Sequence, residues 1–133
     1  MNKGQAFLVL MLFIGGLILT TGIALAYITI SSVNAGYGFQ ASERAEAAAV
    51  AGAEDALVQL DRNAAFAYAS PGYSFSVGSS TATVIVQQNT PSAGLVTVNS
   101  TGVVSGRTRT VKVVVSDNPT TAQISLISWQ DIQ

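Results

Sequence analysis

The feature that most constrains this chain is an uncharged apolar run near its N-terminus. Between Lys3 and Glu43 no residue carries a charge, and residues 6–30 are apolar apart from three threonines and one tyrosine. About 20 apolar residues in a helix cross the hydrocarbon core of a bilayer, which is about 30 Å thick. Lipid offers no partner to backbone N–H and C=O groups, so such a segment has to be helical. The run is therefore predicted to be a membrane-spanning helix.

A cleaved secretory signal is the alternative interpretation of this run. Ala24-Leu25-Ala26 could serve as a small-residue cleavage site, but the apolar run continues past it through Ile30. The apolar region of a signal peptide is usually only about 7–15 residues long, which favours a retained anchor. Lys3 is the only charge on the N-terminal flank, so we expect a cytoplasmic N-terminus and a C-terminal part outside the cytoplasm.

Three glycines interrupt the apolar run at Gly15, Gly16 and Gly22. Membrane helices tolerate glycine, and small residues let neighbouring helices approach closely. In water each glycine would weaken the helix by about 1 kcal/mol relative to alanine. These glycines are either ordinary residues of a membrane helix or positions where the helix packs against copies of itself or unwinds locally.

The helical period continues beyond the apolar run, in a segment that carries charge. On a helical wheel, residues 41–64 place apolar side chains on two sides. The first side carries Val50, Ala53, Leu57, Leu60 and Ala64. The second side carries only small residues, which are Ala41, Ala45, Ala48, Gly52 and Ala56.

Two apolar sides predict two neighbours, because a surface helix with one neighbour needs a single stripe. We expect the larger residues to pack on this chain's own sheet and the small residues to contact another helix. Gly52→Leu would then impair assembly more than folding. Alternatively, the alanines reflect helix propensity alone. Asn34–Gly38, which contains two glycines, marks a bend or the exit from the membrane.

After Asn63 the apolar period changes from helical to alternating, which predicts strands. Residues 64–73 are expected to form a connector that ends in a turn at Pro71–Gly72. Ser105–Gly106 is expected to be a hairpin turn. The predicted strands are 73–77, 81–87, 95–104 with a bulge at Gly102, 107–115, and an edge strand at 124–129.

A sheet of this size cannot close a large core unaided, and the second half of the helix would supply the missing layer. The predicted fold class is therefore α+β. A long N-terminal helix, with a membrane-spanning first half, packs by its second half on a small antiparallel sheet.

No catalytic constellation is present. The chain has no Cys and no His, which excludes thiol catalysis, disulfides and His-based metal sites. Glu54 and Asp55 are adjacent and point in different directions on a helix, so a solvated face is favoured over an acid/base pair. A basic patch for nucleic acid is absent. We expect no enzyme activity, metal or cofactor, and we expect Trp129 to pack on the sheet or, alternatively, to form an exposed contact.

Three stretches of the sequence resemble one family. These are Lys3-Gly4 before the apolar helix, SERAEAAAVAGAEDAL at residues 42–57, and GVVSGRTRTVKVVV at residues 102–115. Together they resemble the type IV pilin-like proteins, which include pilins, minor pilins and the pseudopilins of type II secretion. The resemblance covers most of the chain, and its minor-pilin branch fits best.

The resemblance implies a processing step and a division of the chain. Residues 1–4 would be a leader whose charge is Lys3, and a prepilin peptidase would cut after Gly4 on the cytoplasmic side. Gln5 would then be the mature N-terminus and be N-methylated. Residues 5–30 would be the helix that lies first in the membrane and then in the filament core. Residues 31–62 would be its second half, and 63–133 the head domain.

The chain departs from the family pattern at two positions. Major pilins usually carry a Glu five residues into the mature chain, where this chain has Val9, and they commonly begin with Phe, where it has Gln5. Because certain members at filament tips lack that Glu, the resemblance implies a minor subunit. Its partners would be other pilin subunits, prepilin peptidase, the assembly machinery and, before assembly, membrane lipid.

Three other functions stay open at this point. The chain could be a pseudopilin of type II secretion, a membrane-anchored binding module that never polymerises, or, with least support, a soluble enzyme released by signal cleavage. The mature N-terminus would separate all but the pilin and pseudopilin interpretations.

Overall fold

The computed structural model describes residues 3–118 and 123–132, and the side chains of residues 4–116 and 123–132. The chain divides between Tyr37 and Gly38 into two compact units, here called the N-terminal unit and the C-terminal unit. The fold class is α+β, as the sequence predicts. One long N-terminal helix packs on an antiparallel sheet.

Helix α1 (Lys3–Arg62) includes the apolar run and the charged segment that follows it. It is unbroken at Asn34–Gly38, where the sequence predicts a bend or a membrane exit. The last helical hydrogen bond and a side-chain bond that replaces the next ones meet at Asn63. The Asn63 N–H donates to the Gln59 carbonyl oxygen (2.9 Å), and the Asn63 side-chain oxygen accepts a bond from the Ala65 N–H (3.1 Å). Asparagine suits this position because its side chain can bond to the nearby backbone in place of the helical pattern.

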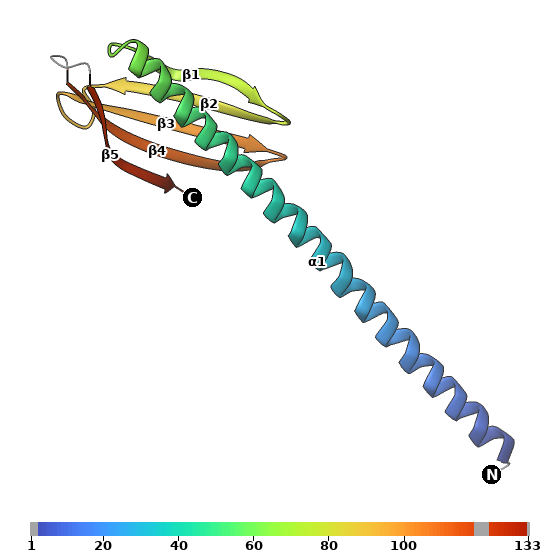
Figure 1. Ribbon diagram of the computed structural model, residues 1–133. Coiled ribbons are helices and arrows are strands. Elements are labelled where there is room, and N and C mark those ends of the chain that lie inside the picture. The colour runs from blue at the N-terminus through green and yellow to red at the C-terminus, as the bar shows by residue number, and fades with distance from the viewer. Residues whose placement is uncertain (1–2, 119–122, 133) are drawn as a thin grey trace. The chain divides into compact units, whose positions relative to one another are not determined.

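The described residues form one five-stranded sheet in which each strand pairs antiparallel with its neighbour in the chain (Figure 1). The predicted hairpin turn is confirmed, because Ser105 and Gly106 have φ angles of 46° and 77°, as a type I′ turn requires. All five predicted strands lie within the observed ones. These are β1 (Tyr68–Val77), β2 (Ser80–Gln88), β3 (Leu95–Val104), β4 (Arg107–Asn118) and β5 (Gln123–Ile132).

The core of the C-terminal unit lies between one face of the sheet and the part of α1 that crosses it (Figure 1). The helix contributes mostly alanines and the sheet mostly valines, so small side chains on one layer face branched side chains on the other. The fully buried apolar side chains of the helix are those of Ala45, Ala48, Ala49, Ala53, Ala56 and Leu60. The fully buried sheet valines are Val84, Val86, Val96, Val98, Val111, Val113 and Val115.

A glycine in β3 allows the helix to lie close to the sheet. The predicted bulge at Gly102 is wrong, because β3 pairs in unbroken register with both β2 and β4 at this position. A Cβ added to Gly102 would overlap the Ala45 carbonyl oxygen and lie 2.7 Å from the Ala49 backbone nitrogen. Glycine is therefore needed here because the backbone of α1 rests against it.

Strand β1 begins earlier than the sequence predicts. It starts at Tyr68, inside the stretch expected to be a connector, and the predicted turn at Pro71–Gly72 lies within it. Tyr68 pairs with Val86 and Tyr73 pairs with Val84, so the residues between the two tyrosines form an irregular, bulged segment. An edge strand can accommodate proline at such a bulge, because the ladder hydrogen bonds are already interrupted there.

We predict that Gly102→Ala lowers the free energy of unfolding of the C-terminal unit by about 1–3 kcal/mol. The added methyl group would meet helix backbone, which cannot move aside as a flexible side chain can. Denaturant unfolding of the full chain in detergent, followed by Trp129 fluorescence, measures the loss. Gly36→Ala is the control, because its added Cβ meets no atom within 4 Å. Equal stability of Gly102→Ala and the unsubstituted protein would contradict the close contact.

Candidate functional site

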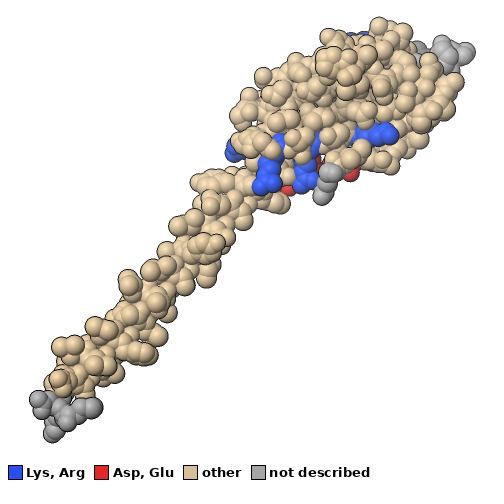
Figure 2. All heavy atoms as spheres, turned by 180° about the vertical axis from the view of Figure 1, so that it is seen from behind, with Lys and Arg blue, Asp and Glu red and all other residues tan. Residues whose placement is uncertain are grey.

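The N-terminal unit has an apolar surface on every side of the helix. All residues from 4 to 37 are exposed, among them Leu12, Phe13 and Tyr27 at 71–75%. In the view of Figure 2 the charged side chains gather on the C-terminal unit. Within the described residues, α1 is one helix long and apolar enough to cross a membrane. A helix that is apolar all round needs lipid or other protein chains around it.

The hydroxyl groups of the threonines in the apolar run donate hydrogen bonds to the backbone of the same helix. Thr20 and Thr21 each donate to the Leu17 carbonyl oxygen, at 3.0 and 2.9 Å. Thr29 donates to the Leu25 carbonyl oxygen at 2.9 Å. These bonds to the preceding turn lower the cost of placing hydroxyl groups in a medium that offers no hydrogen-bond partners. The three polar groups are therefore compatible with burial in lipid.

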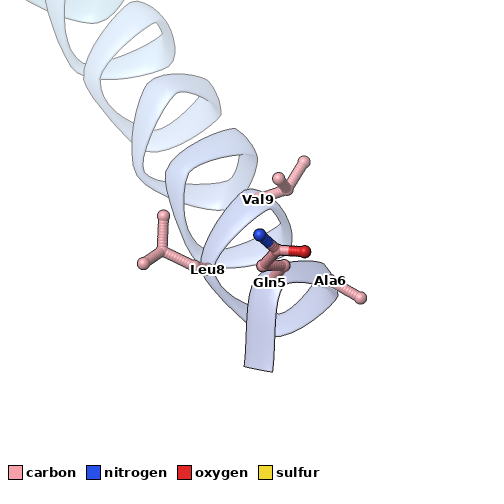
Figure 3. Close-up of a pocket in the computed structure, with 4 residues that line it drawn as sticks. All are labelled: Gln5, Ala6, Leu8 and Val9. Carbon is pink, nitrogen blue, oxygen red and sulfur yellow. The ribbon is translucent and has the colours of Figure 1, made fainter. Parts of the chain in front are cut away.

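The predicted processing residues lie in the first turns of α1. Gly4 and Gln5 are exposed, and a Cβ added to Gly4 would meet no atom within 4 Å. Gln5 and Val9 lie one turn apart on the same side of the helix, and with Ala6 and Leu8 they line an open hollow on its surface (Figure 3). Lys3 is the first described residue of the helix, and its side chain lies outside the described part.

The glycines of the apolar run pack against none of the residues that the structure describes. A Cβ added at Gly15, Gly16 or Gly22 would meet no atom within 4 Å. Gly15 and Gly22 lie two turns apart on one side of the helix, and Gly16 is displaced from them by about 100°. That these positions pack against other copies of the chain stays a prediction.

The second half of α1 differs from the prediction of two separate neighbours. The larger residues pack on the sheet as expected, with Ala53 and Leu60 fully buried and Val50 and Leu57 partly buried at the margin of the core. The buried face is centred between the two predicted stripes, because the branched valines of the sheet need small partners. The small residues expected to contact another helix are instead buried against this chain's own sheet, and these are Ala45, Ala48, Gly52 and Ala56.

Gly52 illustrates why this correction holds. A Cβ at Gly52 would overlap the Ser100 hydroxyl oxygen and lie 2.9 Å from Val84 Cγ2. The Ser100 hydroxyl is buried and has no hydrogen-bond partner among the described residues. Side chains of this chain's own sheet fill the space beside Gly52, so Gly52 is not free to contact a partner helix.

We predict that Gly52→Leu unfolds or strongly destabilises the C-terminal unit, by about 3 kcal/mol or more. This reverses the expectation that the substitution would mainly impair assembly. Ala51→Leu is the matched control, because Ala51 immediately precedes Gly52 in the same helix and is partly exposed. Denaturant unfolding of both variants in detergent makes the comparison. A Gly52→Leu chain as stable as Ala51→Leu would restore the original expectation.

A polar contact that sequence reasoning missed joins α1 to β1. The Tyr73 hydroxyl donates to Asp55 Oδ2 at 2.9 Å, whereas Asp55 was expected on a solvated face. Aromatic rings of Phe66, Tyr68 and Phe75 surround Tyr73, with ring centroids 5.3–6.3 Å away. Burial raises the pKa of Tyr73 above its usual value, and the hydrogen bond to the Asp55 carboxylate raises it further. The alternation of apolar and polar residues at 73–77 could have indicated this contact, since it places Tyr73 on the face of the sheet that packs against α1.

We predict that the stability of the C-terminal unit falls as the pH rises above about 10, because unfolded Tyr73 then loses a proton that the folded state retains. Tyr73→Phe should lower stability by about 1 kcal/mol at neutral pH and should remove this part of the alkaline loss. Unfolding curves of both proteins across the alkaline range measure the difference. Tyr68→Phe, which removes an exposed hydroxyl of the same strand, is the control. An unchanged pH slope in Tyr73→Phe would contradict the prediction.

Strand β5 leaves apolar side chains exposed at the edge of the sheet. Trp129 lies opposite Val113 and is 40% exposed, so it packs on the sheet only in part. Leu126, Ile127 and Ile132 of the same strand are also exposed. Among residues 4–116 and 123–132, no three carboxylates are grouped so that they could hold a metal ion. The absence of enzyme activity stays a prediction.

Searches of protein-family models, curated proteins and solved structures found no match to this chain. The structure establishes the architecture of the chain. A long N-terminal apolar helix packed on an antiparallel five-stranded sheet is a pilin-like architecture.

Proposed function

We propose that this chain is a structural subunit of a type IV pilus-like extracellular filament, as a minor pilin. In this proposal a prepilin peptidase removes residues 1–4. The helix at 5–30 anchors the chain in the membrane with a cytoplasmic N-terminus, and the chain later enters a filament. The observation that carries the proposal is the apolar surface of the N-terminal unit, which is exposed on all sides.

The contrast between the two units supports a structural role. The C-terminal unit buries the valines of its core between its own helix and sheet, so these side chains need no partner to cover them. The N-terminal unit buries nothing within the described chain, so its surface has to be covered from outside. Lipid covers such a surface before assembly, and the same helices of neighbouring subunits cover it in a bundle. Repeated contacts between different surfaces that do not close into a ring give a helical filament.

Val9 supports a minor rather than a major role. It is 66% exposed and lies where the family pattern places a Glu. A subunit without that carboxylate lacks the group thought to pair with a neighbour's N-terminal amine during assembly. We therefore favour a tip or initiating position over the filament shaft.

Two alternatives share parts of this proposal. A pseudopilin of type II secretion would have the same processing and the same helix, and neighbouring genes would distinguish it. A membrane-anchored binding module would keep the helix in lipid permanently, and the exposed apolar residues of β5 would suit a protein contact in either case. For the pilin and the pseudopilin the proposed partners are other subunits, the peptidase, the assembly machinery and, before assembly, membrane lipid, without a cofactor or nucleic acid.

We predict that the mature chain begins at Gln5 and that Gly4→Val abolishes this processing. Because an uncut chain keeps the charged residue Lys3 at the end of its apolar helix, it should stay in the membrane and be absent from sheared filaments. Mass spectrometry of the chain from both fractions, after co-expression with a prepilin peptidase, gives the measurement. Asn2→Val is the control, because it alters the leader away from the cut.

The mature N-terminus also tests the alternatives. An unsubstituted chain that begins at Met1 would favour the non-polymerising anchor, and one that begins near Tyr27 would favour a cleaved signal. Either result would overturn the proposal.

A further inference from the structure

The residue that processing would expose is chemically unusual for a chain terminus. Gln5 is exposed in the first turn of α1 and carries a side-chain amide. We infer that, once cleavage after Gly4 frees its amine, Gln5 cyclises to pyroglutamate, so that the mature chain begins with a neutral lactam. This inference rests on the proposed function, because it requires that cleavage.

The reaction balances without any co-reactant. The α-amino nitrogen attacks Cδ of the side-chain amide, a new N–Cδ bond forms, and the bond between Cδ and the amide nitrogen breaks. The amide nitrogen leaves as ammonia and takes one proton from the attacking amine. The two groups belong to one residue and close a five-membered ring, which gives the intramolecular reaction a large advantage over a bimolecular one.

The surroundings of Gln5 give the lactam a physical role. Val9 lies one turn further along the same side of the helix, close to the exposed side chain of Leu8 (Figure 3). The side chain of Phe7 is also exposed and apolar. The first carboxylate after Gln5 is that of Glu43, beyond the whole apolar run. A copy of the chain lying alongside offers the same apolar segment and no carboxylate within it.

In lipid, or beside a copy of this chain, a terminal ammonium would be a buried charge without a carboxylate partner in the apolar segment. An unpaired charge is costly in lipid or in a packed bundle, whereas the lactam is neutral and needs no counter-charge. Modifications that remove a terminal charge change the electrostatics of a helix end in this way. A neutral lactam at Gln5 needs no carboxylate one turn away, which is consistent with Val9 in place of a Glu.

The lactam also suits the start of a helix. Its ring closes through N and Cα, as the ring of proline does, and proline is accepted in the first helical turn because the N–H groups there have no helical acceptor. A cyclised nitrogen is an amide and no longer a basic amine. Cyclisation would therefore replace the N-methylation that the family resemblance implies.

The test is mass spectrometry of the N-terminal peptide from the full chain, co-expressed with a prepilin peptidase. The expected mature chain begins at residue 5, lacks the mass of one ammonia, and resists Edman degradation until pyroglutamyl aminopeptidase is added. An isotope-labelled peptide with an N-terminal Gln, added at lysis, measures cyclisation during handling. Gln5→Asn is the matched control, because its amide is one methylene shorter and would have to close a strained four-membered ring.

The outcomes separate the inference from the proposed function. A chain cut after Gly4 that keeps an intact or methylated Gln5 overturns the inference alone. Lactam no more abundant than in the labelled peptide also overturns it. A chain that still begins at Met1 overturns the processing and the inference together.

A second measurement tests the role given to the neutral terminus. Gln5→Asn retains the charged amine, so its yield in sheared filaments should fall relative to the unsubstituted chain. Val9→Glu in the Gln5→Asn background should restore part of the yield by supplying a carboxylate one turn away. Equal yields of Gln5→Asn and the unsubstituted chain would overturn the role of charge removal.

Discussion

The backbone contact between α1 and β3 is the constraint on which the C-terminal unit depends. At Gly102 the sheet has no side chain, and the backbone of Ala45 and Ala49 lies directly over it. At Gly52 the helix has no side chain, and Ser100 and Val84 occupy the space. Two glycines on opposite layers thus fix the helix close to the sheet, and the alanines and valines between them can pack at high density. A larger residue at either position would push the helix and the sheet apart along their whole contact.

The two units obtain their stability from different sources. In the C-terminal unit, apolar burial within one chain supports the fold. In the N-terminal unit, the backbone hydrogen bonds of α1 are internal, but the side chains are covered only by what surrounds the molecule. The C-terminal unit can therefore keep its fold whatever surrounds the N-terminal unit. The proposed function, in which a subunit moves from lipid into a filament, would require this independence.

The elements of this fold follow from the sequence more readily than their contacts do. The change of apolar period at Asn63 and the turn residues Ser105–Gly106 locate the helix, the strands and one hairpin, because these are local properties. The wheel of residues 41–64 showed apolar sides but could not show which side the sheet would cover. That depends on the size match between helix alanines and sheet valines, which is a property of the packed pair. Gly102 was misread as a bulge for the same reason. For Gln5 and Val9 the family resemblance supplied only the expectation of a processed terminus and of a missing Glu, and the structure adds that the two residues share one side of the helix.

The order of the sheet has a consequence for how the molecule is made. Each strand lies next to its neighbour in the chain, from β1 to β5, with short connections and no crossover. Contacts in the sheet are therefore close in sequence, which favours rapid folding. The helix surface that forms one side of the core is synthesised before any strand. Each hairpin can then dock as it emerges, and the sheet can grow in the direction of synthesis without waiting for the C-terminus.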